Sequence, residues 1–312
     1  MRRFRIDRIH EKDSFIAHES KFLEMRKRSI DVLLYMLSLL PFWILYGISD
    51  ALYYVLFYVI RYRKHVVFDN LKNSFPEKSE QERYQLAKKF YRFFPDLVIE
   101  AIKMRTMSAE QVLERIELLN PEEVYRHFED NKGVIGVTAH YGNWELGIYS
   151  LSLMTNNPRL VIYKPLNDKA FNEVYNGLRR RFGATMVPMK QILRHVVRLK
   201  DMPYISMFVA DQTPTYQDSD YFMEFLNQET LVYTGTERIA RLTKNPVVYC
   251  HIGRKTKRGH YFCKFTTLVE NPDDYQEHEI TQLHNRFTEQ IIRGQPEYWL
   301  WTHRRWKRKR RI

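Results

Sequence analysis

Gly133-Val-Ile-Gly-Val-Thr-Ala-His-Tyr-Gly-Asn-Trp-Glu145 is the stretch of sequence that decides the fold. Its apolar first half, residues 133–139, predicts a buried strand. Gly142 permits a tight turn and Asn143 is a good N-cap residue, so we expect a helix to begin at Asn143. A buried strand that turns directly into a helix is the building unit of an α/β sheet.

The same stretch carries a candidate active site, because His140 follows the strand and Glu145 falls in the first turn of the helix. Open α/β sheets place their ligand crevices at this end of the strands. We expect Glu145 to hydrogen-bond one nitrogen of the imidazole, which leaves the other nitrogen free to take a proton from a hydroxyl. The alternative is a structural histidine that caps the strand.

The His-x4-acid spacing alone is weak support. Eleven histidines and 37 acidic residues among 312 positions predict about one such match by chance. A second match, His284 with Glu289, lies in the helical pattern of residues 279–292. Five helical positions turn its two side chains about 140° apart, so they cannot meet.

Strand and helix patterns alternate along the chain. We expect strands at residues 133–139, 159–164, near 185 and at 204–210, and a hairpin of residues 247–254 and 260–268. We expect helices after the capping boxes at residues 79–82 and 108–111, and at 121–130, from 143, at 168–181, at 191–200, from 236 and at 279–292. The alternation predicts an α/β fold with a mostly parallel central sheet covered by helices.

Two further polar clusters follow predicted strands, Tyr163-Lys164-Pro165 and Asp211-Gln212. Strand ends of a parallel sheet converge on one edge, so we expect both clusters to share the crevice of His140. Lys164 is suited to give positive charge to an oxyanion or a phosphate, and Asp211 is suited to orient the Lys164 side chain. Each residue alone is often a surface or capping group, so the expectation depends on their convergence.

A net charge of +13 calls for an anionic partner, whether nucleic acid, membrane surface or acidic protein. Seven of the eight residues from Arg304 to Arg311 are basic. Two more basic clusters, residues 26–28 and 61–64, flank the most apolar part of the chain, which is typical of a protein on anionic lipid. The tail lacks a motif of the kind that binds in a groove of DNA or RNA, so the sequence does not favour nucleic acid as the partner. A solvated basic end is the alternative.

The apolar part, Val32–Ile60, predicts an N-terminal membrane-associated helical segment with Asp50 as its single charge. One helix of this length would measure about 43 Å, more than the roughly 30 Å of hydrocarbon, so we expect breaks at Pro41 and Gly47. A span of residues 32–49 with an interfacial helix, a shallow hairpin and a pair of core helices all stay open. The predicted divisions are an extension of residues 1–28, an anchor of residues 29–64 and a domain of residues 65–312.

No metal or cofactor is expected. The histidines are scattered, and Cys250 and Cys263 lie in neighbouring predicted strands, where core packing is expected and a disulfide stays open. The chain has no Gly-x-Ser-x-Gly elbow, P-loop or Gly-x-Gly-x-x-Gly loop, so a serine hydrolase, an NTPase and a dinucleotide enzyme find no support.

Six stretches together carry a family resemblance over about residues 30–308. They are Asp69–Pro76, Ala139–Gly147, Val161–Pro165, Ala210–Gln212, Gly235–Thr243 and Pro296–Lys307. In this order they resemble the late acyltransferases of lipid A biosynthesis, the lauroyl and myristoyl transferase family. The resemblance implies an acyltransferase domain at residues 65–312 and an enzyme at the cytoplasmic face of the bacterial inner membrane. It also implies transfer from acyl carrier protein to a hydroxyl of a lipid A precursor.

On the matching positions the resemblance implies His140 as general base, Glu145 as its partner and direct attack without an acyl-enzyme. The residues expected to bind substrate are Asn143, Lys164, Asp211, Gln212, Arg304 and Arg305. The basic end could meet lipid phosphate or the acidic acyl carrier protein. Other acceptors, such as a lysophospholipid, an amino-acid lipid or another glycolipid, stay open.

The chain departs from the family pattern in two places. Lys164 stands where family members commonly carry Arg. The lysine has a single ammonium group in place of the two parallel N–H donors of a guanidinium. Residues 1–28 match no family counterpart.

Overall fold

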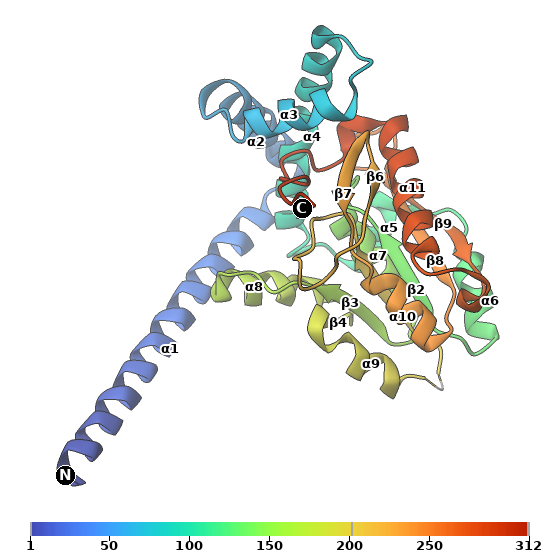
Figure 1. Ribbon diagram of the computed structural model, residues 1–312. Helices are drawn as coiled ribbons and strands as arrows, with labels where there is room; N and C mark the ends of the chain where they lie inside the picture. Colours follow the sequence, from blue (N-terminus) through green and yellow to red (C-terminus); the bar gives the residue numbers. More distant parts are fainter. Residues whose placement is uncertain (1, 201, 311–312) are drawn as a thin grey trace.

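The computed structural model describes residues 2–200 and 202–310, with side chains from residue 21 onward (Figure 1). Seven strands form one sheet in the order β1-β9-β8-β2-β5-β3-β4. Their bounds are β1 (Ile116–Leu118), β2 (Val134–Thr138), β3 (Arg159–Tyr163), β4 (Thr185–Pro188), β5 (Ile205–Val209), β8 (Val247–Arg254) and β9 (Tyr261–Val269). Neighbouring strands run parallel except β8 and β9, which form the expected hairpin. The mostly parallel α/β sheet is therefore confirmed.

Helices cover the sheet and precede it. They are α1 (Arg2–Leu39), α2 (Phe42–Tyr54), α3 (Lys64–Ser74), α4 (Glu80–Lys103), α5 (Ala109–Arg115), α6 (Glu122–Glu129), α7 (Trp144–Met154), α8 (Lys169–Arg179), α9 (Ile192–Arg198), α10 (Gly235–Thr243) and α11 (Glu279–Gly294). A π-helical segment, η1 (Val55–Val59), extends α2, and short 3-10 turns are η2 (Met189–Gln191), η3 (Pro272–Asp274) and η4 (Pro296–Tyr298). Both predicted capping boxes form, at Ser79 and at Ser108.

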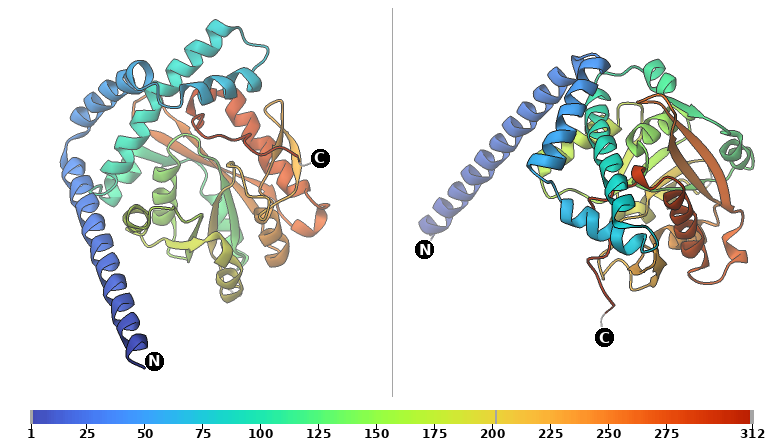
Figure 2. Two further views of the ribbon diagram at one scale, coloured as in Figure 1. Left: turned by 60° about the vertical axis from the view of Figure 1, so that its left-hand side comes forward. Right: turned by 90° about the horizontal axis from the view of Figure 1, so that it is seen from above.

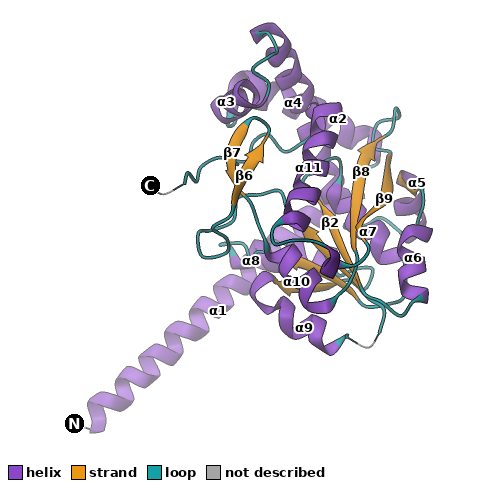
Figure 3. Ribbon diagram, turned by 45° about the vertical axis from the view of Figure 1, so that its right-hand side comes forward, coloured by secondary structure: helices purple, strands orange, loops and turns teal. Residues whose placement is uncertain are grey.

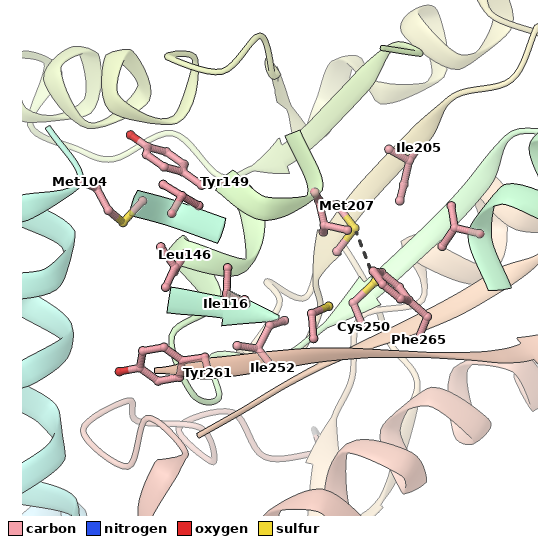
Figure 4. Packing of buried hydrophobic residues seen from close by; sticks show 14 of the residues in the cluster. Met104, Ile116, Leu146, Tyr149, Ile205, Met207, Cys250, Ile252, Tyr261 and Phe265 are labelled. Carbon is pink, nitrogen blue, oxygen red and sulfur yellow. Dashed lines mark hydrogen bonds between the residues drawn. The ribbon is translucent and has the colours of Figure 1, made fainter. Parts of the chain in front are cut away.

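Buried side chains fill two layers, one on each face of the sheet. Alternate residues of β2 show the division, because Val134 packs with α5 and α7 while Ile135 and Val137 pack with α9, α10 and α11. Figure 4 shows the first layer, where Cys250 and Met207 meet through their sulfur atoms at 3.9 Å. Both cysteines are free and buried in the core, so the expected packing role is confirmed and a disulfide is absent.

The N-terminal segment differs from the expectation in one of its two breaks. α1 ends at Leu39 and α2 begins after Pro41, so the proline break is confirmed. The break at Gly47 is wrong, since Gly47 lies inside α2, and residues 32–49 do not form one helix. The predicted boundary at residues 28 and 29 falls within the continuous α1, and the division into domains stays a prediction.

α2 is attached to the body by polar contacts on one face. Its Tyr46 donates a hydrogen bond to Glu100 and its Ser49 donates one to Asp96, both on α4. The helical segment Phe42–Val59 is apolar and long enough to cross a membrane, with a mean hydropathy of 1.4. Figure 2 shows α2 lying along the body while α1 extends away from it. Helix packing on α4 is the physical reason that α2 continues through Gly47.

A second, two-stranded sheet was not expected from the sequence. Its strands, β6 (Phe222–Phe225) and β7 (Gln228–Leu231), pair as an antiparallel hairpin that stands apart from the main sheet and next to α11 (Figure 3). The turn residues Leu226 and Asn227 both have positive φ, as a tight hairpin turn requires. Leucine is an unusual residue at such a position, so the sequence does not predict the turn.

Candidate functional site

A cavity of about 300 Å³ opens where β2, β3 and β5 end and α7 and α8 begin. The sequence-predicted residues that line it are His140, Glu145, Tyr163, Lys164 and Gln212. The convergence expected from three separate strand ends is therefore present. It follows from the sheet order, in which β2, β5 and β3 are adjacent and parallel.

His140 is paired with Asp211, and not with Glu145 as expected. Its Nδ1 lies 2.6 Å from Asp211 Oδ1. The register of the sheet explains this pairing, because Thr138 of β2 lies opposite Val209 of β5, and each polar residue stands two positions further on. The same contact corrects the expectation that Asp211 orients Lys164. The imidazole is left with Nε2 as the nitrogen available to a substrate.

Asp211 is a buried carboxylate with both oxygens engaged. Oδ2 accepts a hydrogen bond of 2.7 Å from Trp299 Nε1, while Oδ1 faces the imidazole. Burial alone would raise its pKa, but the charge and hydrogen bond of His140, together with the Trp299 bond, lower the pKa of Asp211 to about 2. Asp211 therefore stays ionised at neutral pH and holds the Nδ1 proton of the imidazole.

Glu145 instead binds Arg179 of α8. Arg179 Nε donates to Glu145 Oε2 at 2.8 Å, a second guanidinium nitrogen contacts Oε1, and Trp144 Nε1 also donates to Oε1 at 2.8 Å. Burial would raise the pKa of Glu145, but the charge of Arg179 lowers it below its usual value. The carboxylate that the His-x4-Glu spacing marks is thus the counterion of a buried arginine.

Arg179 is the site residue that sequence reasoning missed. Its side chain is 13% exposed, lines the cavity and lies over the Tyr175 ring with 4.6 Å from the guanidinium carbon to the ring centroid. In the sequence it belongs to the run Leu178-Arg-Arg-Arg181, which is typical of a solvated basic helix end. No local signal separates Arg179 from its two neighbours.

Four predicted substrate-binding residues lie outside the cavity lining: Asp211, which is paired with His140, and Asn143, Arg304 and Arg305. Asn143 is buried, where it caps α7 by accepting from the Leu146 amide and donates to Glu100. Arg305 is also buried and donates to the Leu231 carbonyl, and Arg304 is exposed. Asn143 and Arg305 thus make contacts within the protein, and their role in substrate binding stays a prediction. Arg311, at the end of the basic tail, is outside the described residues.

Basic side chains nevertheless gather near the cavity mouth. Burial lowers the pKa of Lys307, and the surrounding cations lower it further. These cations are Arg308, Lys164, Arg63 and Arg304, in decreasing order of effect. Because Lys164 is both in this group and in the cavity lining, the positive surface is continuous with the cavity.

One part of the cavity wall is apolar and comes from several elements. It includes Ile162, Leu166, Met189, Phe208 and Tyr233. A wall of this composition favours a hydrocarbon chain, while His140, Lys164 and Arg179 provide the polar part. The geometry can therefore place an apolar group beside a base and beside cations.

Comparison with known proteins agrees with this chemistry. The sequence model of the bacterial lipid A biosynthesis acyltransferase family matches residues 28–308. The chain is 24% identical over 249 residues to the lipid A biosynthesis palmitoleoyltransferase of Escherichia coli K12, with 80% of each chain covered. It is 22% identical over 275 residues to the lauroyltransferase of the same organism, covering 88% of this chain and 89% of the relative.

A third relative, the lipid A biosynthesis myristoyltransferase of Escherichia coli K12, is 22% identical over 239 residues, covering 74% of this chain and 71% of the relative. The family match covers the cavity and the sheet, and it begins within α1, after residue 27. The chain therefore belongs to the bacterial lipid A biosynthesis acyltransferase family and is an acyltransferase.

Proposed function

We propose that this enzyme moves a fatty acyl chain from acyl carrier protein to a hydroxyl of a lipid A precursor, at the cytoplasmic face of the bacterial inner membrane. The names of the family and of the relatives support the acceptor. The single observation that carries the mechanism is the His140–Asp211 pair, with 2.6 Å between Nδ1 and Oδ1, in which His140 lines a partly apolar cavity and Asp211 is buried behind it.

His140 acts as the general base. Asp211 accepts the Nδ1 proton, so Nε2 can take the proton of the acceptor hydroxyl as its oxygen attacks the thioester carbonyl. The imidazolium that forms is stabilised by the ionised Asp211. When the tetrahedral intermediate collapses, the C–S bond breaks and the departing thiolate takes the proton from His140. The base is then regenerated.

The attack is direct, without an acyl-enzyme. Among the residues that line the described cavity there is no serine or cysteine, and the hydroxyl of Thr213 is engaged with His303 and with backbone carbonyls. A covalent route needs a nucleophile beside the base. The chemistry of the lining therefore favours single displacement, with no acyl-enzyme accumulating after donor is added alone.

Lys164 supplies positive charge to the oxyanion or to a phosphate of the substrate. It lines the cavity and is exposed, whereas the charge of Arg179 is neutralised by Glu145. We assign to the Glu145–Arg179 pair the role of holding α8 against α7, which keeps the cavity wall in place. Desolvated pairs of this kind are costly to break one partner at a time.

Membrane attachment is monotopic, through an apolar surface that α2 and η1 share. Trp43 and Val59 have exposed fractions of 75% and 74%. The same helix is fixed to the body by Tyr46 and Ser49, which are hydrogen-bonded to α4. A helix held to the body by buried polar contacts is better suited to lie on a bilayer than to cross it. The basic side chains at the cavity mouth would then meet phosphate groups.

Mass spectrometry of lipid A from cells with and without the gene for this chain tests the acceptor. Loss of the gene should remove one acyl group, and its mass gives the chain length. Complementation with the native chain should restore that mass, and complementation with His140→Ala should not. An unchanged lipid A profile together with an altered phospholipid or amino-acid lipid would reassign the acceptor. Purified protein, acyl carrier protein loaded with different chains and the isolated precursor test the donor.

A further inference from the structure

Another buried carboxylate contacts the turn of residues 140–143, which carries His140 and which we call the catalytic turn. Glu100 of α4 accepts hydrogen bonds from Tyr46 of α2 at 2.9 Å, from Asn143 at 2.7 Å and from Tyr261 of β9 at 2.7 Å. Three elements distant in sequence thus meet at one side chain. Glu100 is absent from the lining of the active-site cavity, so it has no contact with substrate there.

The contact with Asn143 has a specific consequence for α7. Asn143 Nδ2 donates to Glu100 Oε2, so the NH2 group of the Asn143 amide points toward Glu100. The amide oxygen must then face the Leu146 N–H, where it makes the 2.9 Å cap of α7. Glu100 therefore determines which way the cap is oriented, three residues after His140.

The rest of the turn is already closely constrained. The Gly142 N–H donates to the Tyr298 carbonyl, and the Leu300 N–H donates to the His140 carbonyl. Gly142 has φ of +57°, and a Cβ there would stand 2.1 Å from the Ile252 carbonyl oxygen. The C-terminal segment and β8 hold one side of the turn in this way, and Glu100 holds the other side through Asn143.

The network also reaches α2, the helix that carries the exposed apolar surface. Tyr46 and Ser49 each donate one hydrogen bond to α4, but only Tyr46 bonds the carboxylate that also holds Asn143. The Tyr46 hydroxyl also accepts a 3.4 Å hydrogen bond from Arg115, and each of the two contacts with α4 joins α2 to one carboxylate. This pair allows attachment of α2 to be separated from its link to the catalytic turn.

We propose that Glu100 is a positioning residue that sets the catalytic turn through Asn143 and links that turn to the seating of α2 through Tyr46. The inference rests on the proposed function, in which His140 is the base. A carboxylate with three buried donors loses one acceptor contact when it becomes an amide, since glutamine brings its own donor group. The position of His140 relative to the acceptor hydroxyl should change accordingly.

Steady-state transfer by the purified full-length chain, measured over a range of pH, tests the role of Glu100. Glu100→Gln should lower kcat about tenfold and leave the KM for acyl carrier protein donor unchanged, because Glu100 does not line the cavity. The pH profile of kcat should also shift, since the proton acceptor is displaced. A merely structural loss of folded enzyme would scale kcat equally at every pH, and circular dichroism gives the folded fraction.

Tyr46→Phe and Ser49→Ala form the matched comparison for α2. Each removes one hydrogen bond between α2 and α4, so their unfolding midpoints should fall by similar amounts. Tyr46→Phe should lower kcat about fivefold with a shifted pH profile, and Ser49→Ala should retain the native kcat and profile. Equal kcat values in both variants would overturn the link to α2.

The outcomes separate this inference from the proposed function. If Glu100→Gln keeps the native kcat and pH profile while His140→Ala is inactive, the positioning role is refuted and the base assignment stands. If His140→Ala retains native turnover, the assignment of His140 as the base in the proposed function is refuted, and the inference about Glu100 loses its basis. A tenfold loss in Glu100→Gln without any change in the shape of the pH profile also refutes positioning and indicates a loss of active enzyme only.

Discussion

Two buried carboxylates beside His140 have different partners. Asp211 faces the imidazole, and Glu145 faces Arg179, although Glu145 is the residue that the His-x4-Glu spacing marks. The sequence predicts that His140, Lys164 and Gln212 share a crevice, because each follows a strand. It does not reveal which carboxylate meets the histidine, since that depends on β5 lying next to β2 in register. The repeated pattern Ala139-His and Ala210-Asp at two strand ends is the only local signal.

Asp211→Asn should therefore be the more damaging of two isosteric changes. An asparagine can donate to Nδ1 and favour the wrong tautomer, which in a catalytic triad costs on the order of a thousandfold to ten-thousandfold in kcat. Glu145→Gln leaves the His140–Asp211 bond intact and should lower kcat less, while it destabilises the fold by about 3 kcal/mol or more because Arg179 loses its charge partner. Measured kcat values and urea unfolding curves check both. A larger kcat loss in Glu145→Gln would assign the imidazole partner to Glu145 after all.

Substitution of Lys164 is a second test at the level of a single residue. Lys164→Ala should reduce kcat/KM on the order of tenfold, because positive charge is lost from the cavity mouth. Lys164→Arg keeps the charge and offers a fork of donors, so its activity should lie between alanine and native or exceed native. Initial rates at two ionic strengths measure this order. A rate for Lys164→Arg below that of Lys164→Ala would remove Lys164 from the site.

At the scale of elements, α8 connects the cavity to the N-terminal helix. One side of α8 lines the cavity with Asn172, Tyr175, Asn176 and Arg179. Its other contacts reach α1 through the Arg26–Asp168 and Lys27–Glu173 ion pairs, at 2.7 Å and 2.8 Å. Arg26 and Lys27 precede the family match, which begins at residue 28. The charges of the extension were visible in the sequence, but their partners depend on the continuation of α1 through residue 28.

Charge reversal tests the α1–α8 contact. Lys27→Glu places two carboxylates together and should weaken the packing of α1, whereas Lys27→Glu combined with Glu173→Lys should restore it. Because exposed pairs contribute less than about 1 kcal/mol, we expect a twofold to fivefold rise in the KM for the acyl donor in the single variant at low salt, and little effect at high salt. Kinetics at two salt concentrations measure this. An equal KM in the single and double variants would show that the ion pair does not position α8.

Over the whole molecule, exposed apolar side chains collect on one surface next to basic ones. Trp43, Tyr54, Val59 and Ile60 of α2 and its extension are exposed, and Arg61 and Arg63 follow them. The sequence predicts the apolar segment and its basic flanks, because composition carries both. It does not predict that α2 is docked on α4, since the polar partners Asp96 and Glu100 are distant in sequence. Tertiary packing therefore decides between a span and a surface helix.

Vesicle flotation tests this surface. Trp43→Glu should reduce binding to vesicles with anionic lipid at least tenfold, because a charge replaces a large apolar side chain that is 75% exposed. Leu242→Glu on α10 is the matched control, since Leu242 is also exposed, at 57%, but lies away from α2. It should bind vesicles like the native chain. Equal loss in both variants would point to a general effect of charge, and no loss in Trp43→Glu would exclude this surface.

Acid should destabilise the whole fold through three histidines, of which His284 is fully buried and His251 and His303 are partly buried. Burial lowers the pKa values of His251, His284 and His303 to about 4, whereas histidines of the unfolded chain titrate near 6.5. Between these values the unfolded chain binds more protons, so the stability contribution is complete above pH 6.5 and is lost as the pH falls toward 4. Each histidine contributes a slope of up to about 1.4 kcal/mol per pH unit in this window.

Glu100 acts in the opposite direction, because burial raises its pKa and its contribution is lost as the pH rises. The stability that Glu100 gains as the pH falls does not cancel the stability that the three histidines lose. Urea unfolding at pH 7.5, 6.5, 5.5 and 4.5 should therefore show a steady fall of the unfolding free energy below pH 6.5. His284→Leu removes one of the three titrating groups, so the same series should show a shallower fall for this variant. An unfolding free energy that stays constant from pH 6.5 to 4.5 would mean that these histidines titrate in the folded chain as they do in the unfolded chain.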